Sequence, residues 1–390
     1  MSQTLKFGNK TWATKVGSTL AYNDLSGNYK PLPFAFTRST SATRVNKEGL
    51  IEVVTNDRPR IDYTDTSDGV LLLEPVRTNL WTESEGTNIT LNSPLGEFGF
   101  YTLKNSQISR TISASDPISF TFIVKKIDGT IPTITTSGGN GDLVIYVSGG
   151  SGAGISGVLT DIGNGFYKYE LKIANTGGGS QVIQNKSGVD TYVSLIQFEV
   201  GSFPTSYIPT QSSARTRVAE TASDSGNSEV FNDSEGVLFA DISALADDGT
   251  YRVFGLSDGT TSNRVILYYN PNSNNIELFI SSGGAAQTTL NLTLTDIKLL
   301  QKVAVKYKVN DIGLWINGFE VGRDTIATMP IGLNELAFDN GTGIQPFFGK
   351  TKEIGYYDTI LTDLELETLT SYKSWTSMVN ELNLNIIYNG

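Results

Sequence analysis

Residues 302–308 read KVAVKYK, and residues 312–321 read IGLWINGFEV. In both segments apolar side chains recur with the period of two that is typical of a strand with one face in a core. Within the second segment, Asn317 and Gly318 separate the alternating runs 312–316 and 319–321. Asn-Gly is the preferred pair for the two-residue turn of a β-hairpin. The segment therefore predicts an antiparallel hairpin and places the chain among β proteins.

The same alternation recurs along the chain. Forty Gly and 12 Pro among 390 residues favour turn-rich β structure, and the glycine-rich segments 138–141, 149–152 and 177–179 are predicted turns. We predict a mostly β fold with an extended N-terminal region, followed by two antiparallel β-sandwich domains. The further predicted strands lie at 118–124, 143–147, 166–173, 237–242, 251–256, 265–269 and 276–280.

Three consecutive domains follow from this pattern, with boundaries at 1–92, 93–222 and 223–390. Residues 211–233 are rich in Ser, Thr, Asp and Asn, and we predict a linker there. Near the C-terminus, Thr362 and Glu365 have the spacing of a capping box, in which each side chain hydrogen-bonds the other residue's backbone N–H. A short helix is therefore predicted at 362–369.

Composition excludes several classes of site. The chain has no Cys and no His, which excludes disulfides, thiolate metal sites and any mechanism that uses a histidine base. Forty acidic residues against 29 basic ones give a net charge of −11, which opposes nucleic-acid binding. We find neither a signal peptide nor an apolar run long enough to span a bilayer, and expect no membrane insertion and synthesis in a cytoplasm.

The most unusual segment is 37–80, which carries five arginines in an acidic chain. It contains RSTSATRV at 38–45, GLIE at 49–52, PRIDY at 59–63 and LLEPVRTNL at 72–80. A second block reads FEVGSFPTSYIPT at 198–210, followed by TRVA at 216–219. In this order the motifs resemble the N-terminal region of bacteriophage tail-fibre and head-fibre (spike) proteins.

The resemblance implies a virion structural protein made in a bacterial host cytoplasm. Its expected partners are other virion proteins, further copies of itself in a homotrimer, and host-surface glycan. It also implies that the extended N-terminal region is an anchoring region that attaches the protein to the virion. The middle domain is then expected to be a jelly-roll like those of carbohydrate-binding modules. Residues 302–321, with Phe347-Phe348-Gly349 and Glu353-Ile354, resemble the concanavalin A-like (laminin G-type) lectin fold.

Candidate glycan-binding residues are tyrosines, because aromatic rings stack on sugar C–H groups. Four occur as adjacent pairs, so one member of each pair must point away from the core of its strand. A surface or interchain tyrosine is the alternative at each position. The four residues are Tyr268, Tyr269, Tyr356 and Tyr357.

Two oxygen-rich loops suggest calcium, which binds carboxylate and carbonyl oxygens. They are Asp339-Asn340-Gly341 and Asp247-Asp248-Gly249, and we predict Asp339 and Asn340 as the calcium ligands. Asp, Asn and Gly also favour turns without any ion, and both interpretations remain open. No other cofactor is expected.

The arginines of the 37–80 segment are candidate assembly and anchoring residues. Acidic residues alternate with them, so local or intersubunit ion pairing is the favoured interpretation. The five are Arg38, Arg44, Arg58, Arg60 and Arg77.

These features predict a non-enzymatic fibre or spike protein that binds host-surface glycan multivalently. Paired carboxylates are the remaining route to general acid/base chemistry, but Glu353 and Asp358 have the wrong spacing for a glycosidase pair, and Glu365 and Glu367 are expected on a solvated helix. Two alternatives stay open: an architectural capsid-fibre or tail-adaptor protein, and a polysaccharide-depolymerising tailspike.

Overall fold

The structure is a computed structural model that describes residues 3–24, 27–113, 117–136, 141–147, 156–173 and 179–384. Half of the chain is in strands and 4% is helical, which confirms the predicted mostly β fold. Most of the predicted glycine-rich turns lie outside the described residues. No helix in the described ranges has the length and apolar character needed to cross a membrane.

The chain forms two compact units, each assembled from separate stretches of sequence. Unit 1 comprises 1–39, 56–75 and 220–390, and unit 2 comprises 40–55 and 76–219. The predicted N-terminal region 1–92 is thus shared between the two units. Residues 211–233, predicted as a linker, are divided at residue 220 and contribute strands to both units.

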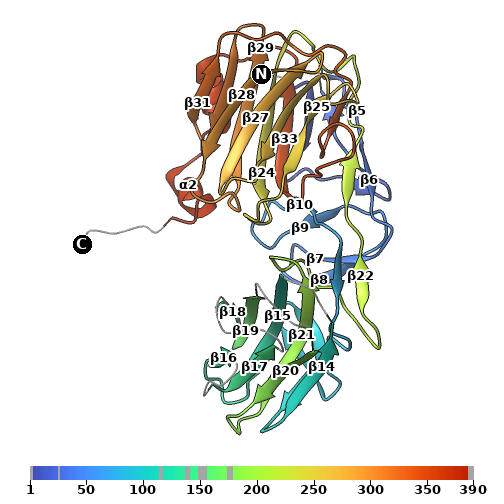
Figure 1. Ribbon diagram of the computed structural model, residues 1–390, viewed down its shortest axis with the longest axis vertical. Helices are drawn as coiled ribbons and strands as arrows, with labels where there is room; N and C mark the ends of the chain where they lie inside the picture. Colours follow the sequence, from blue (N-terminus) through green and yellow to red (C-terminus); the bar gives the residue numbers. More distant parts are fainter. Residues whose placement is uncertain are drawn as a thin grey trace, which may run out of the picture. The chain divides into compact units, whose positions relative to one another are not determined.

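Unit 1 contains a ten-stranded sheet around strands β24 and β33 (Figure 1). Strand β33 pairs with β24 along one edge, and with β1 and β10 along the other. Strand β10 contains the apolar run Leu71–Leu73 and is buried along its whole length. The strands are β31 (Phe319–Asp324), β30 (Ile312–Ile316), β29 (Gln301–Lys308), β24 (Glu235–Ala244), β33 (Gly349–Tyr357), β1 (Leu5–Gly8), β4 (Tyr22–Asn23) and β5 (Lys30–Pro31), with β10 (Val70–Leu73) and β9 (Arg60–Asp62) beside β33.

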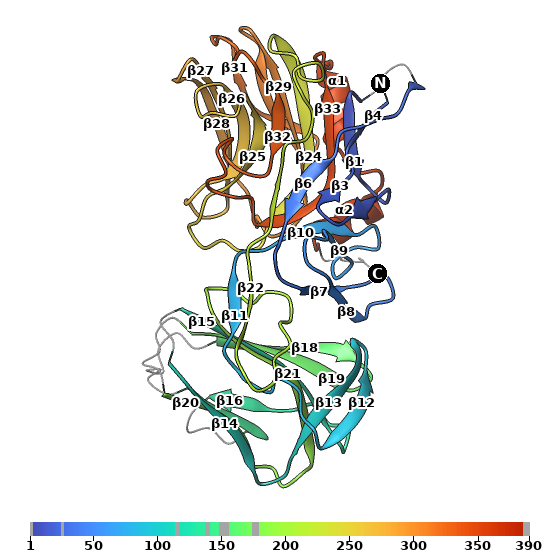
Figure 2. The same ribbon diagram turned by 90° about the vertical axis from the view of Figure 1, so that its right-hand side faces the viewer.

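A five-stranded antiparallel sheet packs on the first one, and Figure 2 shows the two as separate layers of a sandwich. The core between them includes apolar side chains of β1 and β6 from the N-terminal stretch as well as those of residues 230–356. The second sheet has the order β28 (Ala285–Thr293), β27 (Asn275–Ser282), β26 (Arg264–Tyr269), β25 (Arg252–Ser257) and β32 (Glu335–Ala337). A small sheet adds β2 (Thr14–Lys15), β3 (Ser18–Thr19), β6 (Phe34–Thr37) and β23 (Thr221–Ser223).

The predicted hairpin is confirmed: β30 and β31 pair, and Asn317 and Gly318 join them. Their φ angles of 50° and 90° lie in the left-handed region that a type I′ turn requires.

The described residues also form two helices, α1 (Asp363–Thr370) and α2 (Trp375–Glu381). Helix α1 begins with the predicted capping box of Thr362 and Glu365. Its Leu366 packs with Phe239, Trp315 and Tyr357 on the face of the large sheet that points away from the sandwich core. The predicted short helix is therefore confirmed, and it covers a second apolar surface.

Unit 2 is a sandwich of a six-stranded and a four-stranded sheet (Figure 2). Its core is built around Phe120, Phe122, Phe198 and Trp81. The larger sheet has the order β12 (Ile89–Ser93), β13 (Gly96–Leu103), β21 (Thr191–Val200), β15 (Ile118–Lys126), β19 (Phe166–Ile173) and β18 (Ser156–Gly163). The smaller one has the order β14 (Gln107–Ile112), β20 (Gly179–Asn185), β17 (Leu143–Val147) and β16 (Ile134–Thr136), and two ribbons pair β11 (Arg77–Asn79) with β22 (Arg215–Arg217) and β7 (Ala42–Val45) with β8 (Ile51–Val54).

Candidate functional site

The outer face of the five-stranded sheet of unit 1 carries a group of aromatic and polar side chains around a pocket. On β26, Val265, Leu267 and Tyr269 point into the sandwich core. The alternate residues Arg264, Ile266 and Tyr268 therefore lie on the opposite face. On β27 the same alternation places Glu277 and Phe279 on that outer face, beside their β26 neighbours.

Arg264, Ile266, Tyr268 and Phe279 line a pocket of about 250 Å³, which we call the aromatic pocket. Its floor is apolar, because Val253 and Ile266 are buried there. Polar and aromatic groups form the rest of the lining, which makes the pocket suitable for a ligand with both apolar and polar faces. These lining residues are Tyr251, Arg264, Tyr268, Phe279 and Gln345.

The two tyrosine rings of the pocket contact each other. Their centroids are 5.8 Å apart with an interplanar angle of 48°, and Tyr251 is 42% exposed. The Tyr268 hydroxyl donates a hydrogen bond to Glu277, whose other carboxylate oxygen accepts from Asn270 Nδ2 at 2.9 Å. Burial and this neighbouring carboxylate raise the pKa of Tyr268 well above its usual range. Tyr268 is therefore a fixed, uncharged aromatic surface, and Glu277 is engaged in holding it.

Arg264 supplies the positive charge of the pocket. Its Nη1 donates to the carbonyl oxygen of Asn340 at 3.0 Å, and its Cζ lies 5.4 Å from the centroid of the Phe279 ring. Burial lowers the pKa of this guanidinium, since the charged form loses contact with water. Nothing in the sequence analysis singled out Arg264, Tyr251 or Phe279. Period-two spacing from Tyr268 could have found Arg264, but only the fold brings in Tyr251 and Phe279.

The four tyrosines proposed from the sequence occupy different environments. Tyr268 lies in the aromatic pocket. Tyr269 and Tyr356 are core residues; Tyr269 donates to the carbonyl of Ile242 at 3.2 Å, and the Tyr356 hydroxyl lies 2.8 Å from that of Tyr307. Tyr357 points away from that core but is covered by α1 and is 6% exposed. We therefore correct the assignment: Tyr269, Tyr356 and Tyr357 are not accessible to a glycan.

Two of the five arginines form a buried charge cluster within unit 1. Arg38 Nη1 lies 2.6 Å from Glu220 Oε1, and Arg60 Nη2 lies 2.8 Å from Glu74 Oε2. Arg60 also binds Glu220 through two of its nitrogens. The side chains of Arg38, Arg60 and Glu220 are fully buried. This corrects their assignment as assembly residues, because each cation already has a carboxylate partner in the same chain.

The other three arginines differ from one another. Arg44 pairs with Glu52 at 2.5 Å across the β7–β8 ribbon, as local ion pairing predicts. Arg77 lies with its Cζ 4.9 Å from the centroid of the Phe203 ring. Arg58 is exposed. An assembly role therefore stays a prediction, and Arg58 has the exposure that such a role requires.

The oxygen-rich loops are satisfied by their own polar groups. Asp339 Oδ1 accepts from the N–H groups of Gly341 and Gly343 at 2.7 and 3.0 Å. Asn340 Oδ1 accepts from Thr342, and Asp248 pairs with Arg252 at 2.9 Å. Within the described ranges, no three or more acidic side chains are grouped in a way that could hold a metal ion. This geometry agrees with turn chemistry, and the calcium site stays a prediction without structural support.

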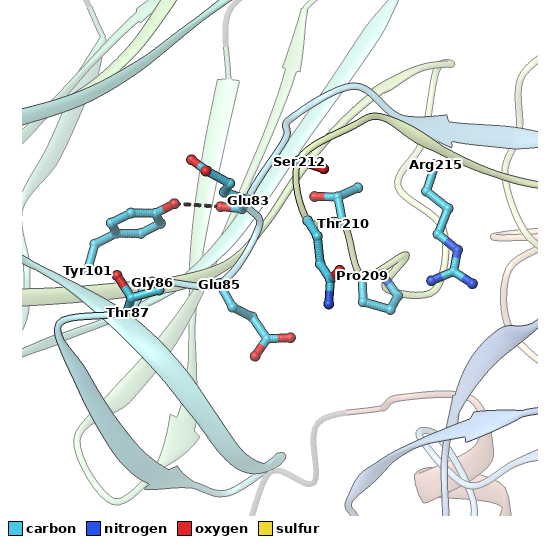
Figure 3. Close-up of a pocket in the computed structure, with 10 residues that line it drawn as sticks. Glu83, Glu85, Gly86, Thr87, Tyr101, Pro209, Thr210, Ser212 and Arg215 are labelled. Atoms are coloured by element: carbon cyan, nitrogen blue, oxygen red, sulfur yellow. Dashed lines mark hydrogen bonds between the residues drawn. The ribbon is translucent and has the colours of Figure 1, made fainter.

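Unit 2 contains a second pocket, of about 560 Å³, at the loop 83–87 (Figure 3). The Tyr101 hydroxyl donates to the carbonyl oxygen of Glu83 at 2.7 Å, while the Glu83 carboxylate pairs with Arg110. Glu85 accepts from the buried hydroxyl of Tyr207 at 3.3 Å, and burial followed by the charge of Glu85 raises the pKa of Tyr207. Neither Glu83 nor Glu85 was predicted as a site residue, because nothing in a short polar segment shows that it lines a pocket.

The proteins that this chain is similar to are found among solved structures, at low sequence identity. No family model matches it, and no curated protein matches it. Among solved structures, CBM40 of the Ruminococcus gnavus IT-sialidase, bound to α2,3-sialyllactose, is 19% identical with a TM-score of 0.32, over 36% of this chain and 84% of its own. The leech intramolecular trans-sialidase, complexed with 2,7-anhydro-Neu5Ac, is also 19% identical with a TM-score of 0.32, over 37% of this chain and 24% of its own. The Trypanosoma rangeli sialidase, in complex with sialic acid, is 11% identical with a TM-score of 0.31, over 90% of this chain and 66% of its own.

These comparisons correct one expectation. The sequence predicted a non-enzymatic protein, but two of the similar structures are a trans-sialidase and a sialidase, which are enzymes. The prediction that this chain lacks catalytic activity is therefore withdrawn.

Proposed function

We propose that this protein is a phage fibre or spike protein that binds glycan in the aromatic pocket of unit 1. The observation that carries the glycan-binding part is the pairing of Tyr251 and Tyr268 on the rim of a partly open, apolar-floored pocket. Aromatic rings provide flat apolar surfaces for sugar C–H groups, while polar side chains beside them fix the orientation of the hydroxyl groups. Gln345 and Arg264 are the polar side chains suited to this role.

The virion part of the proposal is supported by the motifs at 38–80 and 198–219, which resemble phage fibre proteins. The same resemblance supports a homotrimer and contacts with other virion proteins. A trimer would present three pockets on each fibre, so that weak individual sites add up to a high avidity. Sedimentation equilibrium of the full chain tests this assembly: a species of one chain mass, 42.2 kDa, at all concentrations would contradict it.

The glycan-binding part is tested with the full chain on a glycan array, followed by calorimetry with the best ligand. Tyr251→Ala and Tyr268→Ala should each weaken binding about tenfold or more, by analogy with the 1–3 kcal/mol lost when an aromatic stacking surface is removed. Tyr268→Phe keeps the ring and should retain most of the binding. Tyr29→Ala is the matched control, because Tyr29 is a 74% exposed tyrosine of the same unit outside the pocket.

Two results would overturn this proposal: no glycan bound by the wild-type chain, or undiminished binding by folded Tyr251→Ala and Tyr268→Ala variants.

Release of reducing ends from the bound polysaccharide is measured in the same samples, with Glu85→Gln as the variant, because Glu83 and Glu85 line the pocket of unit 2. This measurement addresses catalysis separately from binding.

A further inference from the structure

Arg264 lines the aromatic pocket and has no acidic partner in the described part of the chain. Its one hydrogen bond to another described residue goes to the neutral carbonyl of Asn340, and its Nε is buried without any partner. No carboxylate of the described residues lies within 4.0 Å of its guanidinium nitrogens. By contrast, Arg252 on the neighbouring strand pairs with Asp248 at 2.9 Å, and Arg323 pairs with Glu320 at 2.6 Å.

Glu277, the acidic residue beside Tyr268, makes no ion pair with Arg264. Glu277 uses one oxygen for the Tyr268 hydroxyl and the other for Asn270. The positive charge of Arg264 therefore has no carboxylate paired with it among the described residues. The Arg264 side chain is half-buried and lines the aromatic pocket. A partly desolvated cation of this kind favours an anion that enters the pocket.

We infer that the aromatic pocket recognises an acidic sugar, whose carboxylate or sulfate group binds the Arg264 guanidinium while its ring lies against Tyr251 and Tyr268. This inference rests on the proposed glycan-binding function and specifies its ligand class. A guanidinium presents parallel N–H donors that match two oxygens of a carboxylate or sulfate, and the planar Phe279 ring supports it from one side. The net charge of the chain is −11, so its long-range electrostatic field does not attract an anion. Binding of an anion in the pocket therefore depends on the local positive charge of Arg264.

The experiment measures the affinity of the full chain for three matched oligosaccharides by calorimetry. One is neutral, one carries a uronic acid carboxylate, and one carries a sulfate on the same neutral backbone. A charged hydrogen-bonded contact should make one or both acidic ligands bind about 10- to 100-fold more tightly than the neutral one. Comparison of the two acidic ligands identifies which anion the pocket prefers. The preference should weaken as salt concentration rises.

Arg264→Gln should remove this preference, so that the neutral and the acidic oligosaccharides bind with similar affinity. Arg58→Gln is the matched control, since it removes the same charge from an exposed position of unit 1. Arg264→Lys keeps the charge but loses the paired donors, and should retain part of the preference; it also serves if Arg264→Gln does not fold.

The outcomes separate this inference from the proposed function. Equal binding of neutral and acidic ligands, with loss of both in Tyr268→Ala, would overturn the role of Arg264 and leave glycan binding intact. An acidic preference that persists in Arg264→Gln would place the anion elsewhere and also overturn the inference. Failure of the wild-type chain to bind any of the three oligosaccharides or any arrayed glycan would overturn both.

Discussion

Arg60 and Glu220 are 160 residues apart in the chain, yet the Arg60 guanidinium donates through Nε and Nη2 to the two carboxylate oxygens of Glu220. Burial opposes the charge of Arg60, but Glu220 and Glu74 outweigh it and raise the pKa of the guanidinium. The pair joins the arginine-rich segment to the first residue of the last stretch of unit 1. It therefore fixes a tertiary contact rather than a local one.

We predict that Glu220→Gln destabilises the protein by about 3–5 kcal/mol, because it leaves two buried guanidinium groups without their shared carboxylate. Urea unfolding followed by tryptophan fluorescence measures the change. Glu229→Gln, at an exposed position of the same unit, should change stability by less than about 0.5 kcal/mol. Equal stability of the two variants would show that the cluster contributes little.

Substitution of Phe7 tests whether the N-terminal stretch contributes to the core of unit 1. Its ring is 1% exposed and packs against Trp12 and Phe34 at centroid distances of 5.2 and 5.1 Å. Phe7→Ala should cost about 3–5 kcal/mol in thermal or urea unfolding. The control is Phe319→Ala, since that phenylalanine is 73% exposed. A Phe7→Ala variant as stable as wild type would contradict the packing described here.

Gly318 tests the β30–β31 hairpin. Its φ of 90° is strained for any residue with a Cβ, so Gly318→Ala should cost about 1–2 kcal/mol. Gly313→Ala in the same hairpin is the control, because an added Cβ there would have no neighbour closer than 3.4 Å. Denaturant unfolding of the two variants should therefore differ clearly; a neutral Gly318→Ala would argue against the type I′ turn.

The capping box of α1 should contribute measurably to stability. The Thr362 hydroxyl accepts from the Glu365 N–H at 3.3 Å, and Glu365 Oε2 accepts from the Thr362 N–H at 2.8 Å. Thr362→Ala removes one half of this arrangement and should cost about 1 kcal/mol, whereas Thr362→Ser should be close to neutral. Chemical unfolding distinguishes the two; identical losses would show that the hydroxyl does not cap the helix.

The same capping box predicts a pH dependence. Hydrogen bonds from the backbone and hydroxyl of Thr362 lower the pKa of Glu365 below its usual value. Because the folded-state pKa is depressed, the carboxylate contributes stability above its unfolded pKa, and that contribution is lost as pH falls through the folded pKa. NMR titration of the Glu365 carboxyl carbon should show a low midpoint in the wild type and a higher one in Thr362→Ala. An unchanged midpoint would contradict this assignment.

The local structure was largely predictable from the sequence. Asn317-Gly318 specified its turn, and the spacing of Thr362 and Glu365 specified a helix start, because both signals depend on neighbouring backbone groups alone. Alternation along β26 also placed Tyr268 and Tyr269 on opposite faces. The mostly β class followed from many such local patterns.

The tertiary structure decided which of these faces are open and which charges are paired. Tyr357 and Tyr268 both point away from the sandwich core, but α1 covers Tyr357, whereas Tyr268 borders a pocket. Glu220 became the partner of Arg60 although the segment around it reads as a polar linker. Alternation determines the direction of a side chain within its strand, but its solvent exposure and its ion partners depend on segments that are distant in sequence. For that reason the strands, the turn and the helix start follow from local sequence, whereas only the folded chain brings Arg264, Tyr251 and Tyr268 to one pocket.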